Sequence, residues 1–115
     1  MNENNLISII TVVKNNEKTI EKCINSVLGQ NYKNLEYIII DGNSTDKTLS
    51  IVNKYRDKIS VVISEKDKGQ ADAINKGFRN CDGEIMAWIN SDDIFLPNNF
   101  NIIINYFNNN PDVDV

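Results

Sequence analysis

Two adjacent carboxylates follow a short apolar run late in the sequence. Asp92 and Asp93 come directly after Asn90 and Ser91, and the preceding run, Ile85–Ile89, suits a strand buried on both faces. In an open α/β sheet, such a strand end lies where ligands bind. Carboxylate oxygens there could hold Mg²⁺ or Mn²⁺ against the phosphates of a substrate. The alternative is a solvated turn in which an aspartate caps the next helix.

Another carboxylate, Asp41, lies at the end of an earlier apolar run, Leu35–Ile40. Gly42 and Asn43 follow it and permit a positive φ and a sharp reversal. Because one of residues 44–46 can cap the next helix, Asp41 is not needed for that role. It could accept hydrogen bonds from a ring N–H or a ribose hydroxyl, and a purely structural role is the alternative.

The hydrophobic pattern predicts strands alternating with helices, which favours βαβ units and a mainly parallel sheet. The predicted strands are Leu6–Val13, Leu35–Ile40, Ile59–Ile63 and Ile85–Ile89. The inward positions of the predicted helices are Ile20, Ile24, Val27 and Leu28 after Glu17; Leu49, Val52 and Tyr55; Ala71, Ile74 and Phe78 after Gln70; and Phe100, Ile103, Ile104 and Phe107 after Pro97.

Right-handed crossovers leave a small set of strand orders, and among these we expect 3-2-1-4. That order has a switch point between the first and fourth strands, where ligand crevices form. The acidic pair Asp92–Asp93 and the turn after Val13 should then face one crevice, with Asp41 beside it. The polar stretch 108–115 carries no closing strand, so we expect the domain to continue beyond it.

Composition narrows the possible functions. The chain has 115 residues and a formal net charge of -4, which fits one globular domain. No cluster of Lys and Arg stands out, so we expect no nucleic-acid partner. The sequence has no His, which excludes His-bound zinc and leaves acid–base chemistry to carboxylates.

Cys23 and Cys81 are far apart in sequence, and we expect both to be free thiols. The N-terminus is polar, and no apolar run approaches the roughly 20 residues of a membrane span. These features predict a cytoplasmic protein.

The sequence lacks the motifs of several other classes of α/β protein. Residues 14–17 contain no glycine, which argues against a dinucleotide fingerprint and a Walker loop. A sugar-phosphate nucleotidyltransferase would need a Gly-rich, basic loop at the same place. A receiver domain would need acidic residues at the end of the first strand, where Val12 and Val13 stand.

Four segments occur in the order seen in family 2 glycosyltransferases: Thr11–Glu17, Asp41–Asp46, Asp67–Gly77 and Asn90–Asp93. The chain resembles this family, whose members are inverting enzymes of the GT-A fold, over nearly its whole length. The resemblance implies an α/β, Rossmann-like three-layer sandwich. It also implies that residues 1–115 form the nucleotide-sugar-binding N-terminal part of such a domain.

The resemblance implies a role for each matching residue on the nucleoside side. Thr11 and Val13 would line the nucleotide pocket, partly through backbone atoms. Glu17 would lie near the base or the ribose. Asp41 would bind the base, most often uracil in this family, and Asp67 would border the base pocket.

On the diphosphate side, the resemblance implies that Asp92 contacts a metal ion, Mn²⁺ or Mg²⁺. Asp93 would support it or touch the donor sugar, and Asp72 would face the sugar diphosphate. Two positions depart from the family pattern. Asn90 replaces a frequent Asp, and Ile74 replaces a frequent Arg, so a metal contact and a diphosphate contact are weakened.

The implied activity is the inverting transfer of a sugar from a nucleotide-diphosphate donor, with a UDP-sugar as the expected donor, to a saccharide or lipid-linked acceptor. The implied setting is surface polysaccharide synthesis in the cytoplasm, with peripheral association at the inner face of the membrane as an option. The catalytic base, an Asp or Glu in the family, is expected C-terminal to Val115. The alternative is a non-catalytic α/β module that binds a nucleotide or a protein.

Overall fold

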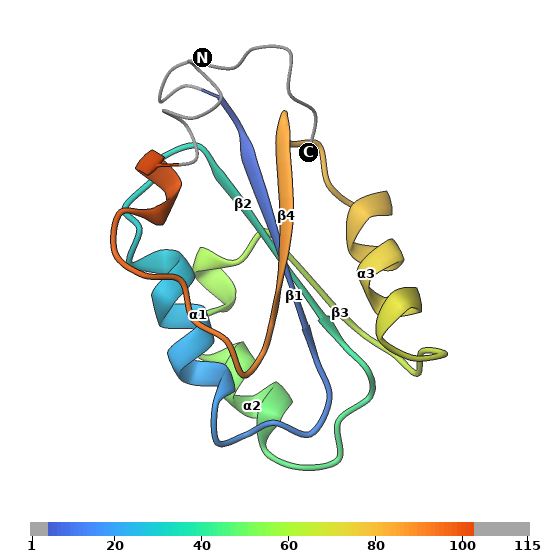
Figure 1. Cartoon of the computed structure of the whole chain (residues 1–115). Coiled ribbons are helices and arrows are strands. Elements are labelled where there is room, and N and C mark those ends of the chain that lie inside the picture. The colour runs from blue at the N-terminus through green and yellow to red at the C-terminus, as the bar shows by residue number, and fades with distance from the viewer. Residues whose placement is uncertain (1–4, 103–115) are drawn as a thin grey trace.

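The computed structural model describes residues 5–102 of the chain (Figure 1). Strands and helices alternate, as the hydrophobic pattern predicts. The expected inward positions Ile103, Ile104 and Phe107 lie outside the described residues.

A parallel sheet forms the centre of the molecule. Its strands are β1 (Ile7–Val13), β2 (Leu35–Asp41), β3 (Val61–Ser64) and β4 (Ile85–Asn90). They lie in the order β3-β2-β1-β4, which confirms the predicted order and its switch point. Because Val13 is in register with Asp41 and Val12 with Asn90, the carboxyl ends of β1, β2 and β4 lie side by side.

Helices cover both faces of the sheet, so the predicted three-layer sandwich is confirmed (Figure 1). The helices α1 (Ile20–Leu28) and α2 (Thr48–Asn53) pack on one face, and α3 (Gln70–Arg79) packs on the other. A 3-10 turn, Arg56–Lys58, precedes β3, and residues 99–102 are helical.

The two cores explain the composition of β1, in which every residue is buried. Ile7 and Ile9 face the α1 side, and Ile10 and Val12 face the α3 side. A strand covered on both faces needs this continuous apolar run. The approach of α3 is especially close, because a Cβ on Gly77 would lie 2.4 Å from Cγ2 of Ile10.

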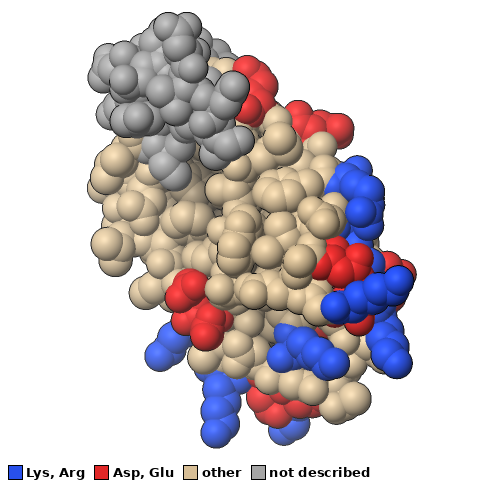
Figure 2. All heavy atoms as spheres, turned by 45° about the vertical axis from the view of Figure 1, so that its right-hand side comes forward, with Lys and Arg blue, Asp and Glu red and all other residues tan. Residues whose placement is uncertain are grey.

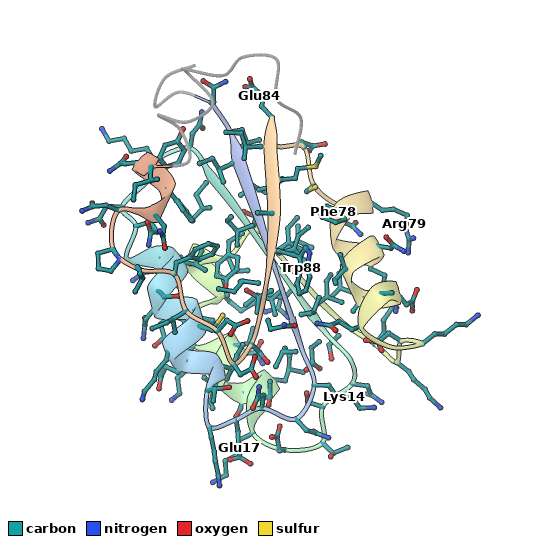
Figure 3. All side chains as sticks on the ribbon, in the orientation of Figure 1. Lys14, Glu17, Phe78, Arg79, Glu84 and Trp88 are labelled. Atoms are coloured by element: carbon teal, nitrogen blue, oxygen red, sulfur yellow. The ribbon has the colours of Figure 1, made fainter. Side chains whose placement is uncertain are left out.

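The prediction that Ile85–Ile89 is buried on both faces is wrong. β4 is an edge strand, and α3 lies over β1 and β2 instead. Met86 and Trp88 are 38% and 42% exposed, and Phe78 of α3 borders them (Figure 3). Figure 2 turns this side of the molecule forward and shows a broad area without charged side chains.

Several predicted boundaries also shift. α1 begins at Ile20 rather than at Glu17, because residues 14–19 form a loop that bonds to its neighbours. β3 begins two residues after the predicted Ile59, which is nevertheless buried. Pro97 precedes the helical residues 99–102 instead of starting that helix, and Phe100 is buried as predicted.

The inward face of α3 differs from the predicted one. Ala73 and Gly77 are buried against the sheet, and Ile74 packs beside them as predicted. Ala71 and Phe78 are exposed instead. Small residues occupy this face because the helix lies so close to β1. A search for large apolar side chains could not identify such a face.

Candidate functional site

An open groove of about 460 Å³ lies at the carboxyl ends of β1 and β4. The start of α3 forms its other wall. The lining residues are Val12, Val13, Lys14, Asn16, Asp67, Gly69, Gln70, Ala73, Asn90, Ser91 and Asp92. The acidic tip and the turn after Val13 therefore face one crevice, as the strand order predicts.

Asp92 is an exposed carboxylate at this groove. The residue before it, Ser91, is only 7% exposed and is held from the loop after β1. Asn16 Nδ2 donates to Ser91 Oγ at 2.8 Å, and Thr19 Oγ1 donates to the Ser91 carbonyl at 3.0 Å. The residue that precedes Asp92 is thus held in place by two hydrogen bonds from the loop after β1. Asp93 is also exposed, and its amide donates to the Asn90 carbonyl at 3.0 Å, which closes the turn.

Gln70 lines the groove on the side formed by α3. Its Nε2 donates a hydrogen bond to Asn90 Oδ1, which joins the start of α3 to the end of β4. Gly69, with φ of 119°, supplies the left-handed conformation from which the helix starts. The sequence analysis assigns Gln70 no role, although Gln70 lies in the segment Asp67–Gly77 and at the start of a predicted helix.

Asp67 joins the loop after β3 to the groove. Its Oδ1 accepts a hydrogen bond from the Gly69 amide at 3.0 Å. Its other carboxylate oxygen lies so close to Gly42 that a Cβ there would approach it to 2.7 Å. Asp67 therefore borders both the groove and the turn after β2.

Asp41 lies beneath the surface and does not line the groove. It is fully buried, and its carboxylate accepts hydrogen bonds from the Ser44 amide at 3.1 Å, the Ser44 hydroxyl at 2.5 Å and the Ser64 hydroxyl at 2.7 Å. The structural role left open by the sequence is thus observed. Contact between Asp41 and a base stays a prediction.

The side chains of Thr11 and Val13 differ in their position relative to the groove. Val13 lines the groove, whereas the Thr11 side chain is buried on the α1 side, where its hydroxyl lies 2.8 Å from the Tyr37 hydroxyl. Burial raises the pKa of Tyr37 well above its ordinary value, and burial also raises the pKa of the Cys23 thiol beside them. These groups stay protonated at neutral pH. Thr11 is fully buried and does not line the groove, so its contact with a nucleotide stays a prediction.

Glu17 and Asp72 lie away from the lining of the groove. Glu17 is exposed in the loop after β1, at the lower end of the molecule (Figure 3). Asp72 accepts a hydrogen bond from the Lys68 amide at 2.9 Å and lies 3.6 Å from Lys76 Nζ. The Lys68 amide, followed by the charge of Lys76, lowers the pKa of Asp72. Contact of either residue with a donor remains a prediction.

The carboxylates at the groove fit a metal site that substrate phosphates complete. Within residues 5–102, no group of three or more His, Cys, Asp and Glu side chains could hold a metal ion. Asp92 can supply one carboxylate at the groove, with Asp93 adjacent. Mg²⁺ is commonly held by one or two carboxylates together with substrate phosphates and water. We therefore expect metal binding here to depend on a bound diphosphate.

Known proteins that resemble this chain in sequence are glycosyltransferases. The model of the family described as Glycosyl transferase family 2 matches residues 8–115. One relative is UDP-Glc:alpha-D-GlcNAc-diphosphoundecaprenol beta-1,3-glucosyltransferase WfaP of Escherichia coli, 39% identical over 92 residues, which are 79% of this chain and 37% of WfaP. The chain spans about a third of the length of the curated relatives that it matches first.

Solved structures share the fold. The crystal structure of S. aureus TarS in complex with UDP-GlcNAc superposes with a TM-score of 0.82 and 28% identity, over 90% of this chain and 31% of that chain. Glucosyl-3-phosphoglycerate synthase from Mycobacterium tuberculosis, crystallised with Mn²⁺, UDP and its product, gives 0.65 and 25% over 76% of this chain and 33% of that one. Within the described residues, no helix is long and apolar enough to cross a membrane.

Proposed function

Because the chain belongs to glycosyl transferase family 2, we propose that residues 1–115 are the donor-binding part of an inverting glycosyltransferase. The donor is a nucleotide-diphosphate sugar, and UDP is the nucleotide that the related structures favour, since TarS and glucosyl-3-phosphoglycerate synthase were crystallised with UDP-GlcNAc and UDP. The observation that carries the proposal is the position of Asp92, exposed on a firmly held tip at the groove between β1 and α3.

Each wall of the groove suits one part of such a donor. Val12 and Val13 offer an apolar floor, and Asp67 lies toward the turn after β2, where the base and ribose would bind. Lys14 is the basic residue among those that line the groove, and it could face the diphosphate. Asp92 would bind the divalent ion, and Asp93 lies beside it for the donor sugar.

Transfer of the sugar breaks an anomeric C–O bond and leaves negative charge on the departing nucleoside diphosphate. A bound Mn²⁺ or Mg²⁺ would stabilise that charge as a Lewis acid. The residues of this chain orient the diphosphate toward Asp92 and hold the nucleoside at the β2 side. The base that activates the acceptor would lie C-terminal to Val115.

The acceptor is proposed by analogy. WfaP is named for a diphosphoundecaprenol acceptor, a saccharide on a lipid carrier. We place this chain in the same kind of reaction, the assembly of surface polysaccharide, in the cytoplasm at the inner face of the membrane. A saccharide free of lipid is the other acceptor class that we consider.

A binding titration tests the donor site. The melting temperature of the protein should rise with UDP plus Mn²⁺ and rise less with UDP alone. The Asp92→Asn variant should lose the Mn²⁺-dependent part of this shift and keep the melting temperature of the ligand-free protein, because Asp92 is exposed. Absence of stabilisation by any nucleoside diphosphate at millimolar concentration would contradict the proposal.

A non-catalytic protein-binding module is the second candidate, and one observation favours it. The exposed apolar surface around Phe78, Met86 and Trp88 is the kind of patch that binds a partner. The relatives carry about two thirds of their length outside the matched region, so the same patch could equally be covered within a longer enzyme. Metal-dependent binding of UDP separates the two functions, because the module predicts none.

A further inference from the structure

Two consecutive asparagines connect the loops around the groove. Asn15 and Asn16 follow β1, in a segment that looks like a simple polar turn in the sequence. Asn15 adopts a left-handed conformation, with φ of 50°. As a result, the two residues bond to different partners, and only one of them reaches the acidic tip.

Asn15 bonds to the loop after β2. Its amide donates to Ser44 Oγ at 2.8 Å, and its Oδ1 accepts from the Thr45 amide at 2.7 Å and the Asp46 amide at 3.3 Å. These contacts hold the loop that follows Asp41. None of the hydrogen bonds described for Asn15 reaches residues 90–93.

Asn16 bonds in both directions. Its backbone amide donates to Thr48 Oγ1 at 2.9 Å, and Thr48 is fully buried at the start of α2. Its side-chain Nδ2 donates to Ser91 Oγ at 2.8 Å, and Ser91 is almost fully buried next to Asp92. One residue therefore connects the start of α2 with the turn that follows β4.

We propose that Asn16 is a positioning residue, which holds Asp92 in place at the groove through Ser91. This inference rests on the proposed function. It assigns no direct contact with the substrate to Asn16. Asp92 affects nucleotide binding chiefly through a cation, so a misplaced Asp92 should weaken UDP binding only when the cation is present.

The size of the effect follows from the single hydrogen bond that is lost. Such a bond contributes enough for a change of about threefold to tenfold in an equilibrium constant. Asn16→Ala should therefore weaken UDP binding in Mn²⁺ by about threefold to tenfold, and by less than about twofold in its absence. Ser91→Ala removes the other end of the same bond and should do the same.

Isothermal titration of UDP, with Mn²⁺ and with a chelator, tests the proposal. The variants are Asn16→Ala, Ser91→Ala and the double variant, which should be no weaker than either single variant because all three lack the same bond. Asn15→Gly is the matched control, since glycine keeps the left-handed conformation while the bonds to Thr45 and Asp46 are lost. Its effect on the dissociation constant should be equal with and without Mn²⁺.

Each result has a defined meaning. A metal-selective loss in Asn16→Ala and Ser91→Ala, and not in Asn15→Gly, supports the positioning role of Asn16. Equal losses with and without Mn²⁺, additive losses in the double variant, or the same metal-selective loss in Asn15→Gly would overturn it while wild-type binding keeps the proposed function intact. If the wild type fails to bind UDP at all, the proposed function falls and the inference with it. Should Asn16→Ala fail to fold, Ser91→Ala decides the matter alone.

Discussion

The contact between α3 and β1 leads to a prediction that runs against helix propensity. Gly77 lies inside α3, where alanine is intrinsically favoured over glycine by about 1 kcal/mol. A Cβ at this position, however, would lie 2.4 Å from Cγ2 and 2.9 Å from Cγ1 of Ile10, which is fully buried. Overpacking of a tight core costs about 1–3 kcal/mol. Because these separations are far below van der Waals contact, we take the upper end and expect Gly77→Ala to lower the free energy of unfolding by about 2 kcal/mol.

Urea denaturation followed by circular dichroism measures this change. Asn75→Ala is the control, because Asn75 is exposed on the same helix and should show the propensity gain alone. In an Ile10→Ala background the atoms that clash are gone, so Gly77→Ala should there become neutral or stabilising. If Gly77→Ala stabilises the wild-type protein by the propensity term, or remains equally destabilising beside Ile10→Ala, the argument from close packing is refuted.

Three further predictions follow from single groups. Ser64→Ala removes one donor from the buried Asp41 and should lower the free energy of unfolding by about 1–3 kcal/mol in the same denaturation assay; no change would show that Asp41 is not held as described. The Lys68 amide lowers the pKa of Asp72 below its ordinary value, so this carboxylate stabilises the fold above pH of about 4 and the contribution is lost as the pH falls through the lowered pKa. The stability difference between wild type and Asp72→Asn should therefore shrink in acid, and a difference that is constant with pH would contradict this. Trp88, the only tryptophan, is 42% exposed, so acrylamide should quench its fluorescence readily, whereas strong protection would show that the apolar surface of β4 is covered.

The sequence predicted the topology because the signals for it are local. The run of β1 is mostly apolar and is buried at every residue, so it is covered on both faces. The change of hydrophobic period along the chain shows where helices follow strands. Right-handed crossovers then leave a small set of strand orders, and the predicted order 3-2-1-4 is one of them. The burial of the similar run Ile85–Ile89 was predicted wrongly, because the composition of a strand does not say whether a neighbouring helix extends over it.

The site was predicted less fully, for two physical reasons. The end of a strand can be located from sequence, but the direction of each side chain depends on the pleat, and the pleat turns Thr11 toward Tyr37 instead of the groove. Contacts between loops distant in sequence are also invisible to a local pattern. Asn16 and Ser91 are 75 residues apart, yet their side chains bond directly.

The polar residues at the carboxyl ends of the strands form two groups, which differ in whether the side chain is hydrogen-bonded within the protein. Buried loop backbone must find hydrogen-bond partners, and here neighbouring loops supply them through short polar side chains. Asp41 and Asn15 are occupied in this way, and so a polar residue at a strand end is by itself weak evidence for ligand binding. Asp92 differs, because its support is provided by Ser91 and its own carboxylate remains exposed at the groove. A carboxylate that is held by its neighbours but not used by them is what a ligand site requires, and this distinction singles out Asp92 more firmly than its position in a motif.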